Sequence, residues 1–149
     1  MPTLIEPEKS ELKFLKVLKK HQGYLMDSIC NLDEFYRKWV KCGKRYFSLI
    51  YCEGCNDFTG FLAGDTSVKT KSPVCYISID KAYKDVGYER FAFREACRLS
   101  LQYGLDNFLL YYNKSVDSIL NLFQMESVTI DDDKYYVVDS TVIRQAFSE

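Results

Sequence analysis

The chain has 149 residues, of which 47% are hydrophobic and 28% charged. These proportions are typical of an ordered globular protein with a substantial core, and the length suits a single domain, so we expect one domain over residues 1–149. The net charge of −1 gives no overall positive field for nucleic acid, and no stretch approaches the roughly 18 apolar residues of a membrane span. Because the first ten residues are polar, unlike a secretory signal, we expect a cytoplasmic protein with neither a membrane nor a nucleic acid as its partner.

The chain contains six cysteines, at Cys30, Cys42, Cys52, Cys55, Cys75 and Cys97. With no signal peptide and enough apolar residues for a core, they are predicted to be reduced thiols, mostly buried. Cys52 and Cys55 have the spacing of half a zinc site, but the sequence has no second closely spaced Cys/His pair, so we expect no metal. The pair lies in a predicted hairpin and not at a helix N-terminus, which argues against a thioredoxin-like role.

The first part of the chain is predicted to be helical. Leu12, Leu15 and Leu18 recur at helical spacing within residues 7–21. The lysines on the opposite face of this helix are interpreted as solvated. A second helix is predicted over residues 31–43, from an Asn-x-x-Glu capping box to a terminal Gly.

From residue 46 onwards the pattern favours strands. Residues 46–51 and 58–63 are predicted to form a hairpin, and a polar loop over 64–72 leads to a strand over 74–79. The later predictions, in order, are a helix over 88–103, a strand over 108–112, a helix over 115–123, a hairpin of 127–130 and 135–138, and a helix over 140–147. The fold class is therefore α/β (α+β), with a mixed sheet of about six strands flanked by helices.

The segment Lys84-Asp85-Val86-Gly87-Tyr88-Glu89 connects the 74–79 strand to a helix, and with the order of elements it resembles the Gcn5-related N-acetyltransferase superfamily. The resemblance covers roughly residues 34 to 138, with the first strand short or absent. It implies splayed fourth (74–79) and fifth (108–112) strands. It also implies acetyl-CoA or another acyl-CoA as cosubstrate, no metal, and direct transfer to an amine.

In that family a Gln/Arg-x-x-Gly-x-Gly/Ala loop holds the pyrophosphate on backbone amides and a helix N-terminus. Lys84 takes the Gln/Arg position and Gly87 the central Gly, whereas Glu89 places a negative charge where the second small residue belongs. The alternative interpretation is a well-capped helix whose charges pair locally. The resemblance implies that cofactor contacts come from Lys84, Asp85, Val86, Gly87, Tyr88, Glu89 and Arg90.

The resemblance places pantetheine in the gap between the splayed strands, against the backbone of Ile77 and Ile79. Asn113, just past the fifth strand, resembles the polar residue often found there. The family's next helix usually carries a tyrosine that protonates the leaving thiolate. Phe123 occupies that position and has no proton to donate.

Other polar groups near the gap are candidates for the chemistry. Strand alternation places Tyr76, Ser78 and Asp80 on one face. Asp80 is a candidate base or a cap for the following loop, and Tyr76 would lie near the acyl group. Tyr112, with Tyr111, is a candidate replacement for the missing acid, the alternative being packing.

Two functions follow. The first is an acyl-CoA-dependent N-acyltransferase acting on a primary amine of a small molecule or protein. The alternative is a catalytically inactive module that binds acyl-CoA or a protein partner, or forms a homodimer; Phe123, Glu89 and the 12 tyrosines favour it. An open cleft between the fourth and fifth strands would favour the enzyme, and a gap filled by Tyr76, Tyr111 or Phe123 the module.

Overall fold

The computed structural model describes residues 2–8, 10–12, 32–41, 43–66 and 72–148. Most of the predicted first helix and of the polar loop after residue 66 lie outside the described residues, as does the start of the predicted second helix. The described residues form a seven-stranded mixed sheet of order β1-β2-β3-β4-β5-β7-β6. Its strands are β1 (Pro2–Ile5), β2 (Arg45–Cys52), β3 (Asp57–Asp65), β4 (Val74–Ile79), β5 (Phe108–Tyr111), β6 (Ser127–Ile130) and β7 (Asp133–Val138).

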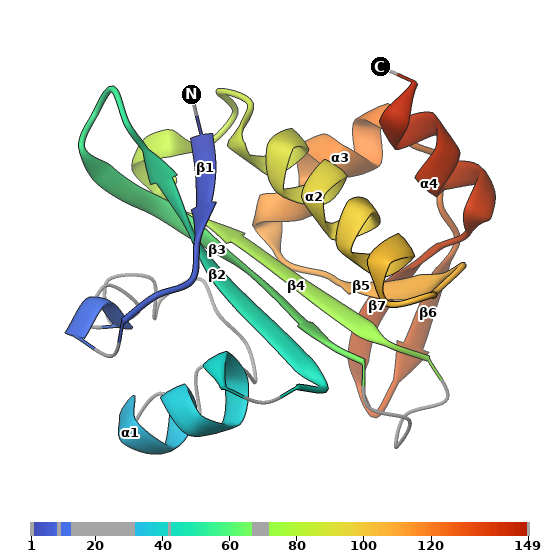
Figure 1. The fold of residues 1–149 in the computed structure, drawn as a ribbon. Coiled ribbons are helices and arrows are strands. Elements are labelled where there is room, and N and C mark those ends of the chain that lie inside the picture. The colour runs from blue at the N-terminus through green and yellow to red at the C-terminus, as the bar shows by residue number, and fades with distance from the viewer. Residues whose placement is uncertain (1, 9, 13–31, 42, 67–71, 149) are drawn as a thin grey trace.

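The helices lie on both faces of this sheet (Figure 1). One face carries α1, which continues into a π-helical turn at Tyr36–Val40; the other carries α2, α3 and α4. The helix bounds are Leu32–Phe35 for α1, Tyr88–Gln102 for α2, Asp117–Leu122 for α3 and Ser140–Phe147 for α4. This mixed α/β architecture confirms the predicted fold class.

Of the two alternatives for the first strand, short or absent, the structure shows the short one, β1. The sequence Thr3-Leu4-Ile5 is too short to predict a strand, yet it pairs antiparallel with β2, Thr3 opposite Tyr51, and raises the sheet to seven strands. Edge pairing with a segment about 45 residues away, and not local alternation, makes it a strand.

Strand alternation divides the core into two layers. Cys75, Ile77 and Ile79 pack on the α2 face, whereas Val74 and Tyr76 pack on the α1 face. The predicted placement of Tyr76 on the face opposite Ile77 is therefore confirmed.

The central parallel pair, β4 and β5, separates early. The two strands pair only at Val74 with Leu109 and at Cys75 with Leu110, whereas β4 stays paired with β3 as far as Ile79. The second half of β4 thus has a strand neighbour on one side only, which confirms the predicted splay.

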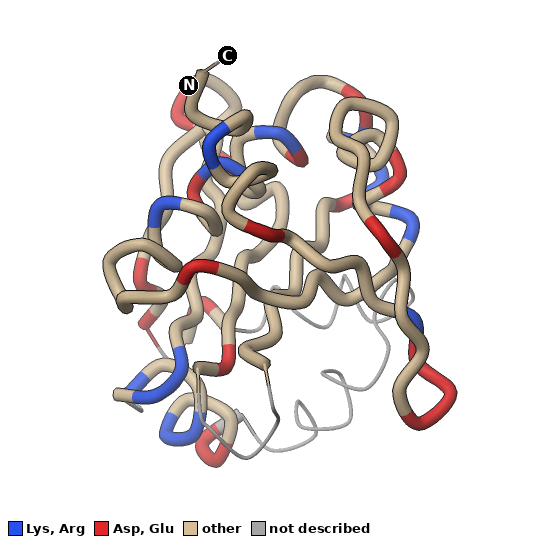
Figure 2. Tube along the Cα trace, turned by 90° about the vertical axis from the view of Figure 1, so that its right-hand side faces the viewer, with Lys and Arg blue, Asp and Glu red and all other residues tan. Residues whose placement is uncertain are grey.

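Charged residues of both signs occur throughout the described part of the chain (Figure 2). Figure 2 shows acidic and basic residues interspersed along most of the described trace. No helix among the described residues is both long enough and apolar enough to cross a membrane.

Strands β3 and β4 approach closely at Gly60, and this contact is testable. A Cβ at Gly60 would lie 2.1 Å from the Ser78 carbonyl oxygen, so the strands must move apart to accept a side chain. We expect Gly60→Ala to lower the free energy of unfolding by about 1–3 kcal/mol in urea titrations. Gly54→Ala, in the exposed turn with no atom within 4 Å, is the control, and an equal loss there would contradict this explanation.

Candidate functional site

The gap between β4 and β5 is bridged by side chains from the segment that follows β5. The Asn113 amide donates to the Ile77 carbonyl oxygen at 2.9 Å, and the Ile79 N–H donates to the Ser115 hydroxyl oxygen at 3.0 Å. The Asn113 side chain also accepts from the Ser115 backbone N–H at 2.8 Å, which fixes its orientation. The two backbone groups expected to meet a cofactor are therefore hydrogen-bonded within the chain.

Asn113 lies where the sequence predicts, beside the gap, but Ser115 was not predicted. The available signal is the Asn-x-Ser spacing, because an Asn that accepts from the N–H two residues on forms an Asx turn. Ser115 is 5% exposed, so its hydroxyl bond to the Ile79 N–H is shielded from water.

Tyr76 and Phe123, two of the side chains considered as fillers of the gap, pack into opposite core layers. Tyr76 is 5% exposed and contacts Trp39 edge-on, with ring centroids 6.0 Å apart, and Tyr111 at 5.4 Å. Phe123 is also 5% exposed and packs on Phe93, with centroids 5.2 Å apart. Phe123 is thus a core aromatic, and the Tyr76 ring is part of the α1-side core.

Asp80 has a structural role. Its carboxylate accepts from the Ala82 N–H at 3.1 Å and caps the 3-10 turn at Lys81–Tyr83, while its own N–H donates to the Thr59 carbonyl oxygen. Capping was the alternative that the sequence left open. A role for Asp80 as a base stays a prediction.

Tyr112 provides a phenol at the end of β5. Its hydroxyl donates to the Asp117 carboxylate at 2.9 Å, and this bond raises the pKa of Tyr112 because ionisation would bring two negative charges together. Tyr112 packs against the same core layer as Phe123. Tyr112 therefore presents a hydroxyl on the α2 side of the sheet, hydrogen-bonded to Asp117.

The loop after β4 folds around the side chain of Glu89, which comes from the first turn of α2. Gly87 has φ 103°, a conformation that favours glycine, and α2 begins at Tyr88. Glu89 is 1% exposed, and its carboxylate accepts from the Asp85 N–H at 2.8 Å. The Glu89 side chain therefore points into the loop, so the predicted contact of this residue with a cofactor cannot come from its carboxylate.

The α2 N-terminus nevertheless keeps the features of an anion site. The helical hydrogen bonds begin with the Phe91 N–H, which donates to the Gly87 carbonyl oxygen, so the Tyr88 and Glu89 amides precede the ladder. A Cβ at Gly87 would meet no atom within 4 Å, and Val86 beside it is 68% exposed. The loop is open on the Gly87 side and closed on the Glu89 side.

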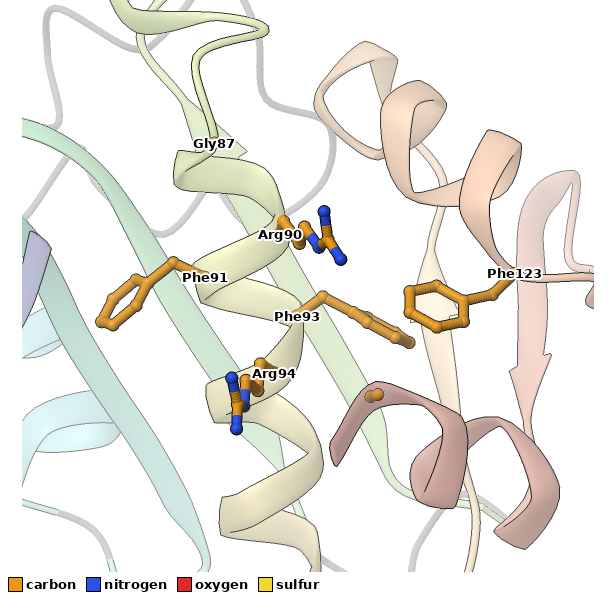
Figure 3. Close-up of a pocket in the computed structure, with 7 residues that line it drawn as sticks. Gly87, Arg90, Phe91, Phe93, Arg94 and Phe123 are labelled. Carbon is orange, nitrogen blue, oxygen red and sulfur yellow. The ribbon is translucent and has the colours of Figure 1, made fainter. Parts of the chain in front are cut away.

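A cavity of about 260 Å³ adjoins this helix terminus. Figure 3 shows Arg90 and Arg94 on successive turns of α2, with Phe93 and Phe123 facing each other beside them. The lining residues are Gly87, Arg90, Phe91, Phe93, Arg94, Phe123 and Ala146. Arg94 was not predicted, although its spacing of four residues from Arg90 places both guanidinium groups on one side of the helix.

The cysteines and acidic residues give no sign of a metal centre. Among the described residues, no three His, Cys, Asp or Glu side chains gather closely enough to hold an ion. The four described cysteines are free thiols; Cys52, Cys75 and Cys97 are buried and Cys55 is exposed.

The bridge across the gap predicts a stability effect. Asn113→Ala removes the donor to the Ile77 carbonyl oxygen and the acceptor for the Ser115 N–H, leaving backbone groups of two buried residues unpaired. We expect the free energy of unfolding to fall by about 1–3 kcal/mol, measured by urea titration. Asn107→Ala, an exposed residue whose amide bonds to neighbouring Asp106, should change it far less, and equal losses would show that Asn113 is no bridge.

No family model and no curated protein matches this sequence. Solved structures match over nearly the whole chain. A mutant form of the spermidine N-acetyltransferase of Vibrio cholerae has TM-score 0.72 and 15% identity, covering 99% of this chain and 98% of that one. The Vibrio cholerae enzyme solved with CoA and spermine has TM-score 0.70 and 14% identity, covering 96% and 98%.

A third structure, an acetyltransferase of the GNAT family from Staphylococcus aureus Mu50, has TM-score 0.67 and 13% identity, covering 94% of this chain and 99% of that one. At these identities the likeness concerns the fold. The chain has the fold of the Gcn5-related N-acetyltransferases, as the element order and the splayed strands predicted.

Proposed function

We propose that the chain is an acyl-CoA-dependent N-acyltransferase, which transfers the acyl group directly to a primary amine of a small molecule or protein in a ternary complex. The observation that carries the proposal is the separation of β4 from β5 after Cys75 and Leu110. It lies toward the end of β4 from which the chain enters the Gly87 loop. The full-length likeness to acetyltransferase structures, one of them solved with CoA, supports it.

The charged groups fit the phosphates of coenzyme A. The open side of the loop at Gly87 presents the α2 N-terminus, Arg90 and Arg94 line the cavity beside it, and Lys84 precedes Gly87 by three residues in the sequence. Guanidinium groups bind phosphate oxygens through paired hydrogen bonds. The pyrophosphate would lie against Gly87 and Arg90, with the cavity beside Arg94 next to it.

Two side chains of the protein, Asn113 and Ser115, compete with the pantetheine arm for the backbone of β4. To lie between the strands, the arm must replace the bonds of Asn113 to Ile77 and of Ser115 to Ile79. Its amide groups carry both the donor and the acceptor that this replacement needs. Entry therefore exchanges hydrogen bonds and requires the two side chains to turn away.

The chemistry requires one proton to leave the amine and one to reach the leaving thiolate. As the amine nitrogen bonds to the thioester carbonyl carbon and the carbon–sulfur bond breaks, the Tyr112 hydroxyl gives up its hydrogen bond to Asp117 and donates its proton to the sulfur. Asp80 or Tyr76 is the proposed group near the acyl carbon that assists loss of the amine proton. Each of these roles belongs to the proposal.

The acceptor and setting are proposed more broadly. We propose a cytoplasmic enzyme that forms a homodimer or binds another protein. One structural neighbour is described as dodecameric and another contains spermine. Polyamines are therefore the first acceptors to test.

Calorimetric titration with acetyl-CoA and with free CoA tests the cofactor site. We expect micromolar binding by the parent chain, and a loss of at least tenfold in Gly87→Glu, because the carboxylate would occupy the open side of the phosphate loop. Gly104→Glu is the matched control: Gly104 also has positive φ (73°) and no neighbour within 4 Å, but follows the C-terminus of α2. No binding by the folded parent would overturn the enzyme proposal.

Tyr112→Phe tests the proposed acid. Removing the hydroxyl should lower kcat for acetyl transfer by about 100-fold, with little change in CoA affinity, because general acids contribute about 10²–10⁴ in rate. Steady-state kinetics beside calorimetry separate the two effects. Tyr103→Phe, at an exposed residue that stacks on Tyr46, should retain full kcat; an unchanged kcat in Tyr112→Phe would exclude this acid.

The second candidate is a module that keeps the fold without the chemistry. The bridge from Asn113 and Ser115 across the gap and the Phe123 ring in the core favour it. CoA binding without acetylation of any amine would support this candidate, whereas turnover with an amine would exclude it.

A further inference from the structure

The turn between β2 and β3 places two thiols side by side. The sulfur atoms of Cys52 and Cys55 lie 2.7 Å apart, and the Cys55 N–H donates to the Cys52 sulfur at 3.1 Å. Cys52 is 5% exposed, whereas Cys55 is exposed at the turn. One sulfur therefore meets solvent and the other lies directly beneath it.

This turn packs on the segment that leads into α2. The Tyr83 hydroxyl donates to the Asp57 carboxylate at 3.0 Å, and the Tyr88 hydroxyl hydrogen-bonds with Cys52. The Tyr83 and Tyr88 rings meet edge-on, with centroids 5.7 Å apart. The sequence predicts that this pair lies in a hairpin and not at a helix N-terminus. In the fold, this hairpin brings Cys52 next to Tyr88, the first residue of α2.

Hydrogen bonding differentiates the pair from the other described cysteines. The bonds from Cys55 and from the Tyr88 hydroxyl lower the pKa of Cys52, while the same contact raises the pKa of Cys55. Burial raises the pKa of Cys97 to about 12 and raises that of Cys75 as well. Cys52, whose pKa is lowered, thus lies beside the exposed Cys55, whereas burial raises the pKa of both Cys75 and Cys97.

We propose that Cys52 and Cys55 are a redox-active dithiol, which peroxide closes to a disulfide beside the start of α2. The exposed Cys55 sulfur loses its proton and attacks hydrogen peroxide; the O–O bond breaks, one oxygen is transferred to the sulfur to give a sulfenic acid, and the hydroxide released takes up a proton and leaves as water. The Cys52 thiolate then attacks that sulfur, the S–O bond breaks, and the hydroxide released takes up a proton to form the second water. The two sulfurs are oxidised by two electrons in all, and the peroxide is reduced.

Closure has a consequence for the neighbouring helix start. A disulfide sulfur is a weaker hydrogen-bond acceptor than a thiol or thiolate sulfur, so closure weakens the interaction of the Tyr88 hydroxyl with Cys52. Tyr88 directly follows Gly87. Oxidation should therefore loosen the loop at Gly87; its effect on coenzyme binding, unlike the closure itself, rests on the proposed function.

Peptide mass mapping tests the closure directly. Trypsin cleaves after Arg45 and Lys69, so residues 46–69 form one peptide that contains Cys52 and Cys55 and none of the other cysteines. The folded chain is treated with hydrogen peroxide, its remaining thiols are alkylated, and it is then digested. We expect this peptide to lose both alkylation sites and the mass of two hydrogens, and to recover them after dithiothreitol.

Matched variants identify the pair. Cys55→Ser, at an exposed turn position, should abolish the loss of two hydrogens, and Cys97→Ser should retain it; circular dichroism verifies that both are folded. An unchanged peptide, oxidation of Cys55 that stops at sulfinic acid, or a link to a different peptide would each overturn the proposal. A closed disulfide with unaltered calorimetry would leave the dithiol established and remove only its effect on the coenzyme site.

Discussion

The early end of the parallel pairing between β4 and β5 is the constraint on which the rest of the site depends. Beyond Cys75, β4 continues along β3 but has no strand on its other side. Backbone groups in a buried strand need partners, since an unpaired one costs free energy comparable to a lost hydrogen bond. Asn113 and Ser115 supply those partners, so the turn after β5 is determined by the open edge of β4.

The polar groups around the gap are satisfied within the chain, which sets the energetics of any ligand. Asn113 bonds to Ile77, Asp80 to Ala82, and Tyr112 to Asp117. A ligand that enters must exchange these bonds for its own, and such an exchange is worth little net free energy. Affinity for an acyl-CoA would therefore come from phosphate contacts beside α2 and from apolar burial.

The sequence could predict features whose signal is local. Alternation and turn residues give β2 to β7, and the Lys84–Gly87 spacing gives the loop. Ser115 was missed, and the first strand is predicted only as short or absent, because their partners, Ile79 and β2, are remote in sequence. Arg94 was missed although its spacing from Arg90 is a local signal. The Cys52 and Cys55 spacing was found in the sequence and the pair lies in the β2–β3 hairpin as predicted, but only the folded chain brings Cys52 to Tyr88.

Glu89 decides how the α2 N-terminus can serve an anion. Its buried carboxylate already takes the Asp85 N–H and so uses part of the favourable field at the helix start. A pyrophosphate must share that terminus with it, and like charges held a few ångströms apart repel. The two are compatible because they use different sides: Glu89 points into the loop, whereas Gly87 leaves the outer side open and Arg90 and Arg94 lie along it. In the proposed function, the internal carboxylate would hold the loop in shape, and Arg90 and Arg94 would offset the negative charge that Glu89 adds in place of a small residue.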